Sequence, residues 1–257
     1  LLMRLKESIA TQKRFLADAA HQLKTPLAGL RMQADLAQRE GASALELTQS
    51  LQHIGRASMR ATHTVNQLLS LARAESGGAN LARQPCNLVE LVTEVIQESL
   101  PRALDRHIDL GYEGVAADNA GVWVSGNRTL LKELFRNLID NAIHYTPSSE
   151  VQPGVVTVRV LADRFSGVAV FQVEDTGPGI PPSERELVFQ PFYRALGTDA
   201  DGSGLGLPIV LEIAHQHSAT VTVDEAHHGR QPPGACFTVR FAQTVPASDA
   251  DLAAHAL

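Results

Sequence analysis

The sequence predicts an α plus α/β protein, in which a helical hairpin precedes a sandwich of helices on a mostly antiparallel sheet. Three observations lead to this prediction. Residues 1–75 repeat apolar residues at a heptad-like spacing, and residues 87–241 mix alternating and helical patterns. The stretch between them, 76–86 (SGGANLARQPC), has the composition of a linker. We expect residues 242–257 to form a C-terminal tail.

The first half reads as two long helices. Apolar or small residues recur at alternating steps of four and three along residues 16–37 and again along 47–72. Ser43 and Glu46, three positions apart, fit a capping box at the start of the second helix. Two helices cannot enclose a core, so we expect the hairpin to pair with a second copy as a four-helix bundle. The alternative is a hairpin that packs on its own C-terminal half.

The second half alternates between helical and strand patterns. Helical patterns occupy residues 87–100, 127–145 and 206–217. Strand patterns occupy residues 122–126, 154–162, 167–175, 219–226 and 235–242.

Composition narrows the class of protein. Hydrophobic residues make up 44% of the chain, and the formal net charge is −6, which argues against a nucleic-acid-binding protein. No 18-residue apolar run is present, so we expect no membrane span within this chain. Cys86 and Cys236 lack the spacing of a zinc site or a disulfide framework, and we interpret them as buried thiols.

Two asparagines share one face of the helix predicted over 127–145. Asn137 and Asn141 lie four positions apart, and asparagine is a poor residue for a helix interior. Their amide oxygens are hard, neutral ligands that suit Mg²⁺. Two solvated asparagines are the alternative interpretation.

Two glycine-rich turns follow. Asp175 ends a predicted strand before Gly177 and Gly179, where it could accept a hydrogen bond from an exocyclic amine such as that of adenine, or simply form a turn. Gly202, Gly204 and Gly206 then precede a helix with Pro208 in its first turn, which is typical of a phosphate cradle. Residues 184–201, between the two turns, could form a lid hinged on glycines.

Together these segments resemble the bacterial sensor histidine kinases of two-component systems. The resemblance covers roughly residues 15–241. FLADAAHQLKTPLAGL resembles the family's phosphoacceptor box, and LFRNLIDNAIHYTP its asparagine box. VEDTGPGI and GSGLGLPIV resemble its glycine boxes, and VFQPFYR its phenylalanine box, all in the family's order. The wording HQLKTPLAGLR is most similar to the tricarboxylate-responsive branch.

The resemblance implies a homodimeric phosphotransfer hairpin followed by an ATP-binding domain of the Bergerat (GHKL) type. His21 would take the γ-phosphoryl group of ATP and pass it to an aspartate in the receiver domain of a response regulator. Asn137 and Asn141 would hold the magnesium–phosphate unit, Asp175 would receive the adenine amine, and Tyr145 would pack beside the base. The five glycines would frame the base and the phosphates. Phe189 and Phe192 would anchor the lid, and Arg194 could reach the phosphates.

Several residues near the phosphoacceptor need separate comment. Gln22 stands where the family often has an acid proposed as the general base, and an amide cannot take a proton at pH 7. Thr25, one turn beyond His21, could position water for removing phosphate from the regulator, or could bond back to a carbonyl. Pro26 should bend this helix. His144 stands where Lys or Arg is common, and a neutral imidazole would be a weaker phosphate partner.

Two other functions stay open at this point. One is an ATP-dependent conformational machine that shares the ATP-binding fold, and the other is a signalling adaptor that binds ATP but transfers nothing. The chain begins with Leu1, which suggests a fragment of a longer protein. From the family resemblance we expect a transmembrane segment upstream, so that this part would be the cytoplasmic domain of an inner-membrane sensor.

Overall fold

The computed structural model describes residues 2–39, 43–76, 83–115, 121–163, 166–194, 203–227 and 229–244. The chain divides into two compact units, Leu1–Arg73 and Ala74–Leu257, and each is described by itself. Within the described ranges, none of the helices combines the length and the hydropathy that a bilayer span requires.

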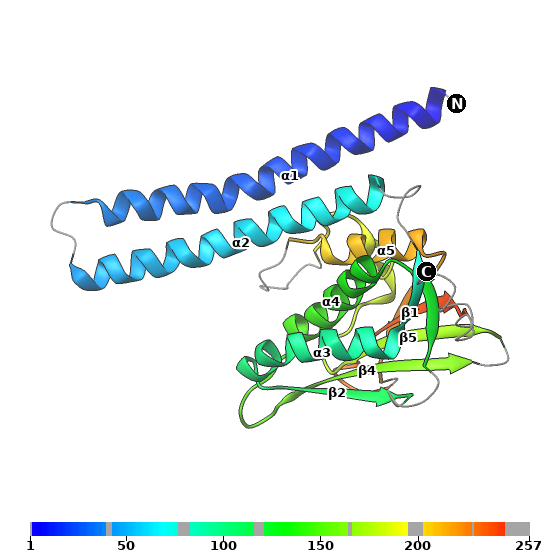
Figure 1. Cartoon of the computed structure of the whole chain (residues 1–257). Coiled ribbons are helices and arrows are strands. Elements are labelled where there is room, and N and C mark those ends of the chain that lie inside the picture. Colours follow the sequence, from blue (N-terminus) through cyan, green and yellow to red (C-terminus); the bar gives the residue numbers. More distant parts are fainter. Residues whose placement is uncertain are drawn as a thin grey trace, which may run out of the picture. The chain divides into compact units, whose positions relative to one another are not determined.

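The first unit is a hairpin of two long antiparallel helices, α1 (Leu2–Ala37) and α2 (Ala44–Ser76) (Figure 1). The predicted capping box at the start of α2 is confirmed. Glu46 N–H donates to Ser43 Oγ (3.3 Å), and Ser43 N–H donates to Glu46 Oε2 (2.8 Å). Helix α1 continues through Pro26, and the bend expected there stays a prediction.

Much apolar surface of the hairpin is left uncovered in a single chain. Leu27, Leu51 and Met59 are 56%, 63% and 67% exposed. Ala19 is buried, whereas Ala20, which the heptad spacing places in the seam, is exposed. Surface of this kind along a helix pair is typical of an interface with another helix pair.

The second unit contains three helices on one face of a five-stranded sheet (Figure 1). The strand order is β2-β4-β5-β7-β6, with β2 parallel to β4 and every other neighbouring pair antiparallel. This confirms the predicted sandwich. The strands are β2 (Ile108–Gly114), β4 (Gly154–Asp163), β5 (Val168–Asp175), β6 (Thr220–Glu225) and β7 (Ala235–Ala242). The helices are α3 (Leu88–Asp105), α4 (Arg128–Tyr145) and α5 (Gly206–Gln216).

Asparagine caps start the first two of these helices. Asn87 accepts a hydrogen bond from Val89 N–H and Asn127 accepts one from Leu130 N–H, each at 3.1 Å, so α3 and α4 each begin directly after a capping asparagine.

Alternate residues of the sheet point into the core. There Phe135 of α4 packs against Phe171 of β5, with ring centroids 4.4 Å apart and both side chains fully buried.

A separate two-stranded ribbon joins β1 (Gln84–Asn87) to β3 (Trp123–Gly126). Strand β1 therefore occupies the last residues of the stretch expected to be a linker. At the other end of the unit, Gln243 bridges to Val124, and Thr244 N–H donates to Trp123 O (2.9 Å). The first residues of the expected tail thus pair with β3, while residues 245–257 lie outside the described part of the chain.

Candidate functional site

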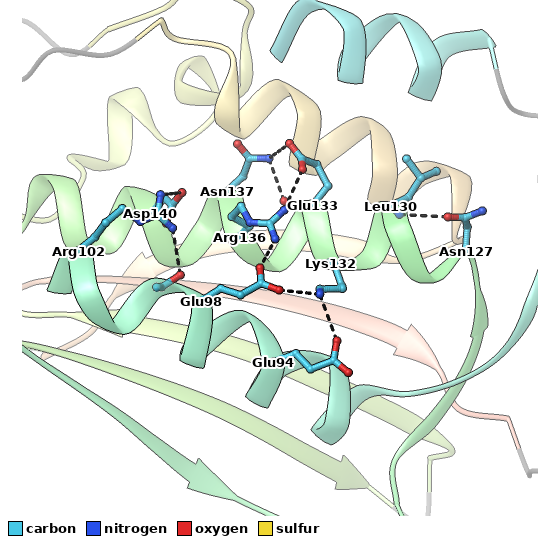
Figure 2. A network of polar contacts seen from close by, with 11 residues as sticks. Glu94, Glu98, Arg102, Asn127, Leu130, Lys132, Glu133, Arg136, Asn137 and Asp140 are labelled. Atoms are coloured by element: carbon cyan, nitrogen blue, oxygen red, sulfur yellow. Dashed lines mark hydrogen bonds and ion pairs between the residues drawn. The ribbon is translucent and has the colours of Figure 1, made fainter. Parts of the chain in front are cut away.

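The site is built around the inward face of α4. This helix is amphipathic and buries Leu131, Leu134 and Leu138 completely against the core. Asn137, only 8% exposed, donates from Nδ2 to the backbone oxygen of Glu133 (2.9 Å) and to its Oε1 (3.3 Å), as Figure 2 shows. Both amide protons are thereby used within α4, so Asn137 Oδ1 is left to accept from, or coordinate, another group.

The two asparagine oxygens converge on the start of α5. A Cβ added to Gly206 would lie 3.2 Å from Asn137 Oδ1 and 3.5 Å from Asn141 Oδ1. Leu205, the N-cap of α5, makes no side-chain capping bond, so the first N–H groups of the helix receive no cap from that residue. Two hard oxygen donors and the positive end of a helix dipole therefore meet at one point. This arrangement fits a divalent cation together with an anionic oxygen ligand.

Asp175 lies at the end of β5 and is 6% exposed. Its Oδ1 accepts two backbone hydrogen bonds, from Gly177 N–H (2.8 Å) and Ala235 N–H (3.1 Å). Burial raises the pKa of this carboxyl, and the two backbone bonds only partly oppose that rise. With Oδ1 held by the backbone, Oδ2 is the oxygen that can accept from a ligand.

Glycines allow two turns to close tightly around Asp175. A Cβ on Gly177 would lie 2.9 Å from Asp175 Oδ1. Gly234 has a φ of +68°, and a Cβ there would lie 2.0 Å from Asp175 O, so no other residue fits. Gly234 was not predicted from the sequence, although it follows the turn-forming pair Pro232–Pro233. Gly179 packs in the same place, with Pro233 Cγ 2.8 Å from where its Cβ would be.

Two short 3₁₀ helices lie at the start of the segment predicted to be a lid: η1 (Pro182–Glu184) leads into it, and η2 (Leu187–Phe189) lies within it. Phe189 contacts Phe237 edge-on, with ring centroids 6.4 Å apart, which attaches this end of the segment to the sheet. Phe192 N–H donates to Gly204 O (2.9 Å). Arg194 is exposed, and residues 195–202, including Gly202, lie outside the described part of the chain.

His144 and Tyr145 end α4. Their rings meet edge-on, with centroids 4.9 Å apart. His144 Nδ1 lies 3.2 Å from Arg106 Nη1 of the segment that follows α3. Both residues thus lie one turn beyond Asn141, on the same helix.

The phosphoacceptor region lies in the other unit. His21 and Gln22 are part of α1, and their side chains lie outside the described residues. The side chain of Thr25, one turn further along, is exposed. The structure therefore brings Asn137, Asn141 and Gly206 together within one unit, while His21 belongs to the hairpin.

Sequence reasoning also missed two supporting residues. Glu133 accepts both hydrogen bonds from the amide of Asn137. Its position four residues before Asn137 on the same helix could have predicted this contact from the sequence. His217 accepts from Asn127 N–H at Nε2 (3.0 Å), and its Nδ1 lies 2.7 Å from Ile213 O, so it joins the end of α5 to the start of α4. No sequence pattern signals this contact.

Two family models match the chain. Residues 126–245 match the family of histidine kinase-, DNA gyrase B- and HSP90-like ATPases, which indicates ATP binding by the second unit. Residues 11–77 match the His Kinase A (phospho-acceptor) domain, and this range includes His21.

Similar proteins cover both units. The chain is 34% identical to the sensor protein kinase PmrB of Pseudomonas aeruginosa over 231 residues, which is 90% of this chain and 46% of PmrB. It is 35% identical over 243 residues to the signal transduction histidine-protein kinase/phosphatase MprB of Mycolicibacterium smegmatis, covering 91% of this chain and 46% of MprB. The chain thus spans about half the length of these curated relatives.

Among solved structures, a mycobacterial sensor histidine kinase MprB superposes with a TM-score of 0.54 at 30% identity. The match covers 63% of this chain and 97% of that structure.

Proposed function

Because this chain belongs to the sensor histidine kinases of bacterial two-component systems, we propose that it is an ATP-dependent kinase that phosphorylates its own His21. The phosphoryl group then passes to an aspartate in the receiver domain of a response regulator. The observation that carries the proposal is the convergence of Asn137 Oδ1 and Asn141 Oδ1 on the start of α5 at Gly206. In this family of ATPases, such an arrangement fits the phosphate end of ATP.

The base end of the nucleotide would bind at Asp175. Its Oδ2 accepts the exocyclic amine of adenine, while Oδ1 stays on the two backbone N–H groups. Gly177 and Gly179 let the backbone close tightly around Asp175, and Tyr145 would pack beside the base. A buried acceptor of this kind selects adenine over guanine, because guanine presents a carbonyl oxygen at the corresponding position.

The phosphates would lie between α4 and the glycine turn at Gly202, Gly204 and Gly206, with Arg194 contributing from the lid. Asn137 and Asn141 would hold Mg²⁺ through their Oδ1 atoms, and the ion, when bound, neutralises charge on the phosphate oxygens. Phosphoryl transfer depends mainly on such positioning and electrostatic stabilisation.

His21 acts as the nucleophile through Nε2. The Nε2–P bond forms as the bond between phosphorus and the β–γ bridging oxygen breaks, and ADP leaves with the bond's electron pair. A neutral imidazole supplies the required lone pair near pH 7, and its Nδ1 proton is lost to solvent or to a neighbouring base. Gln22 can orient the ring through its amide oxygen but cannot accept that proton.

The hairpin would form the dimer. The exposed apolar side chains of Leu27, Leu51 and Met59 support this, since a second hairpin would cover them as a four-helix bundle. Thr25, exposed one turn beyond His21, would position the water that removes phosphate from the regulator. We place this chain on the cytoplasmic side of an inner-membrane sensor, where ATP is available. The membrane-spanning part would belong to the portion of the full-length protein upstream of this chain.

Incubation with γ-³²P-ATP and Mg²⁺ tests the proposal. Label should appear on the unaltered chain, resist alkali and be lost in acid, as expected for a phosphohistidine. His21→Ala should remove the label while ATP-analogue binding stays unchanged, because the nucleotide site lies in the other unit. Binding of ATP without any labelling of the unaltered chain would favour an adaptor or a conformational ATPase instead.

A further inference from the structure

Glu133 holds Asn137 through two contacts on one side of the amide group. Asn137 Nδ2 donates to the backbone oxygen of Glu133 (2.9 Å) and to the carboxylate oxygen Oε1 (3.3 Å). Both of these neighbours are oxygens that can only accept, so the group that faces them must be the NH₂. The amide oxygen therefore points the other way, to the start of α5, where it lies 3.2 Å from the position of a Cβ added to Gly206.

The carboxylate of Glu133 is itself held from the side away from Asn137. Its Oε2 accepts from Arg136 Nη1 (3.4 Å), and Arg136 Nη2 donates to Glu98 Oε2. Figure 2 shows this chain of contacts, which begins at Glu98 on α3 and ends at the amide of Asn137. The side chain of Glu133 is 27% exposed, so a largely shielded negative charge lies behind the amide.

The carboxylate favours one orientation of the amide and polarises it. Turning the amide by half a turn would place Oδ1 against two oxygens of Glu133 and would direct the NH₂ group to the start of α5. A hydrogen bond to an ionised acceptor is about twice as strong as a neutral one, so the carboxylate adds to the preference that the backbone oxygen already sets. Hydrogen bonds in series also polarise one another, which makes Asn137 Oδ1 a stronger ligand for a hard cation.

From this geometry we propose that Glu133 is a positioning residue for the divalent cation that accompanies the nucleotide, an inference that rests on the proposed function. Glu133 keeps the oxygen of Asn137, and not its NH₂ group, directed to the site at Gly206. It acts through Asn137 and does not itself contact the cation or the phosphates. The ligand class is Mg²⁺ in complex with a nucleoside di- or triphosphate.

Titration calorimetry of the full chain with ADP, in EDTA and at a series of Mg²⁺ concentrations, tests the inference. Glu133→Ala should raise about tenfold the Mg²⁺ concentration that gives half of the gain in ADP affinity, as expected for loss of a group that orients a metal ligand. ADP affinity in EDTA should not fall, because a carboxylate offers no hydrogen bond to a phosphate. Glu133→Gln keeps an oxygen acceptor without the charge and should recover part of the Mg²⁺ response.

Glu212→Ala is the matched control. Glu212 on α5 accepts from Gln216 Nε2 (3.2 Å), so it too is a glutamate that holds an amide four residues later on its own helix. Its removal deletes the same charge and the same kind of contact but leaves Asn137 untouched. The Mg²⁺ dependence of ADP binding should therefore stay within about twofold of that of the unaltered chain.

Two further measurements separate positioning from a general electrostatic effect. In an Asn137→Ala background, Glu133→Ala should cause no further change in the Mg²⁺ dependence, whereas a carboxylate that attracted the cation directly would act in either background. The side-chain ¹⁵NH₂ signals of Asn137, recorded without nucleotide or metal, should shift in Glu133→Ala and stay in place in Glu212→Ala.

The possible failures of the two proposals differ. An unchanged Mg²⁺ dependence in Glu133→Ala, an equal change in the Asn137→Ala background, unshifted Asn137 signals, or a matching loss of ADP affinity in EDTA would each overturn the inference and leave the proposed function intact. Failure of the unaltered chain to bind ADP in the presence of Mg²⁺ would overturn both.

Discussion

Replacing Asp175 by asparagine should weaken nucleotide binding about 100-fold while leaving the second unit folded. The two side chains have nearly the same shape, and the site is closed, since Asp175 is 6% exposed. An asparagine oxygen in the place of Oδ1 keeps the hydrogen bonds from Gly177 N–H and Ala235 N–H. The substitution therefore removes the negative charge and replaces the acceptor Oδ2 by an NH₂ donor, but it does not change the packing.

The effect on stability is a balance of two opposing contributions. Burial raises the pKa of Asp175 above its ordinary value of 3.8. The folded chain therefore binds this proton more tightly than the unfolded chain does. The stability that Asp175 contributes is greatest below pH 3.8 and is lost as the pH rises through the folded-state pKa. At pH 7 asparagine removes the cost of a buried charge but weakens two hydrogen bonds by about 1 kcal/mol each, so the free energy of unfolding should change by no more than about 1 kcal/mol.

The effect on nucleotide binding is larger than the effect on stability, and both of its contributions lower the affinity. With its oxygen on the backbone, the asparagine turns its NH₂ group toward the adenine amine, so that two donors face each other. Losing a hydrogen bond to a charged acceptor and leaving a donor unpaired together cost about 3 kcal/mol, which is about a 100-fold weaker Kd.

Titration calorimetry with ADP and urea denaturation at pH 7 measure both quantities on the same sample. Asp224→Asn is the matched control, because Asp224 is an exposed acid whose only ion pair among the described residues is with Arg185 (3.0 Å). It should alter neither quantity appreciably. Nucleotide affinity of Asp175→Asn within threefold of the unaltered chain would refute the role of Oδ2. A loss of stability well above about 2 kcal/mol would refute the account of the buried charge.

Three further predictions address other features. Gly206→Ala should weaken ADP binding at least about tenfold, because its Cβ crowds the amide oxygens of α4, whereas Gly111→Ala, in open space, should bind normally. For His217, burial lowers the pKa below 6.5, so its stability contribution is complete above pH 6.5 and is lost as the pH falls through the folded-state pKa. Urea midpoints should therefore drop between pH 7 and 5, and His217→Gln should flatten that profile; a profile as steep in the variant contradicts the assignment. Leu51→Glu should shift the chain from dimer to monomer in sedimentation at micromolar concentration, and a dimer that persists unchanged would show that this surface is not the interface.

The elements with strong periodicity could be predicted from the sequence. The helix from Arg128 and the strands from Gly154 and Val168 lie where their patterns placed them, because each buries one face against a single core. Strand β2 was missed although Ile108, Leu110 and Tyr112 alternate, since the glycine and the two acids between them have low strand propensity. Strand β1 has only four residues and includes a proline, so local pattern could not reveal it.

The candidate site was less accessible to sequence reasoning. Spacing along one helix could place Asn137 and Asn141 on a common face. It could not show that both oxygens meet Gly206, more than sixty positions away, because that contact depends on how α4 packs against α5. The same holds for Asp175 and Gly234, which meet only once β5 and β7 pair. Assigning His21, Gln22 and Thr25 to chemistry stays a prediction from motif and family. So does the similarity to the tricarboxylate-responsive branch.

Ion pairs join α3 to α4 at residues 38 positions apart, from Glu90–Arg128 through Glu98–Arg136 to Arg102–Asp140, and their charge order has a consequence for how α4 becomes helical. Along α3 the acids come first and the arginines last, which suits the electrostatic polarity of a helix. Along α4 the order is reversed, with Arg128 in the first turn and Asp140 near the end, so these two charges oppose the dipole of the helix that bears them. A synthetic peptide of residues 128–145 should therefore show weaker circular dichroism at 222 nm than one of residues 88–105, and the asparagine-bearing helix acquires its order by docking on its neighbour.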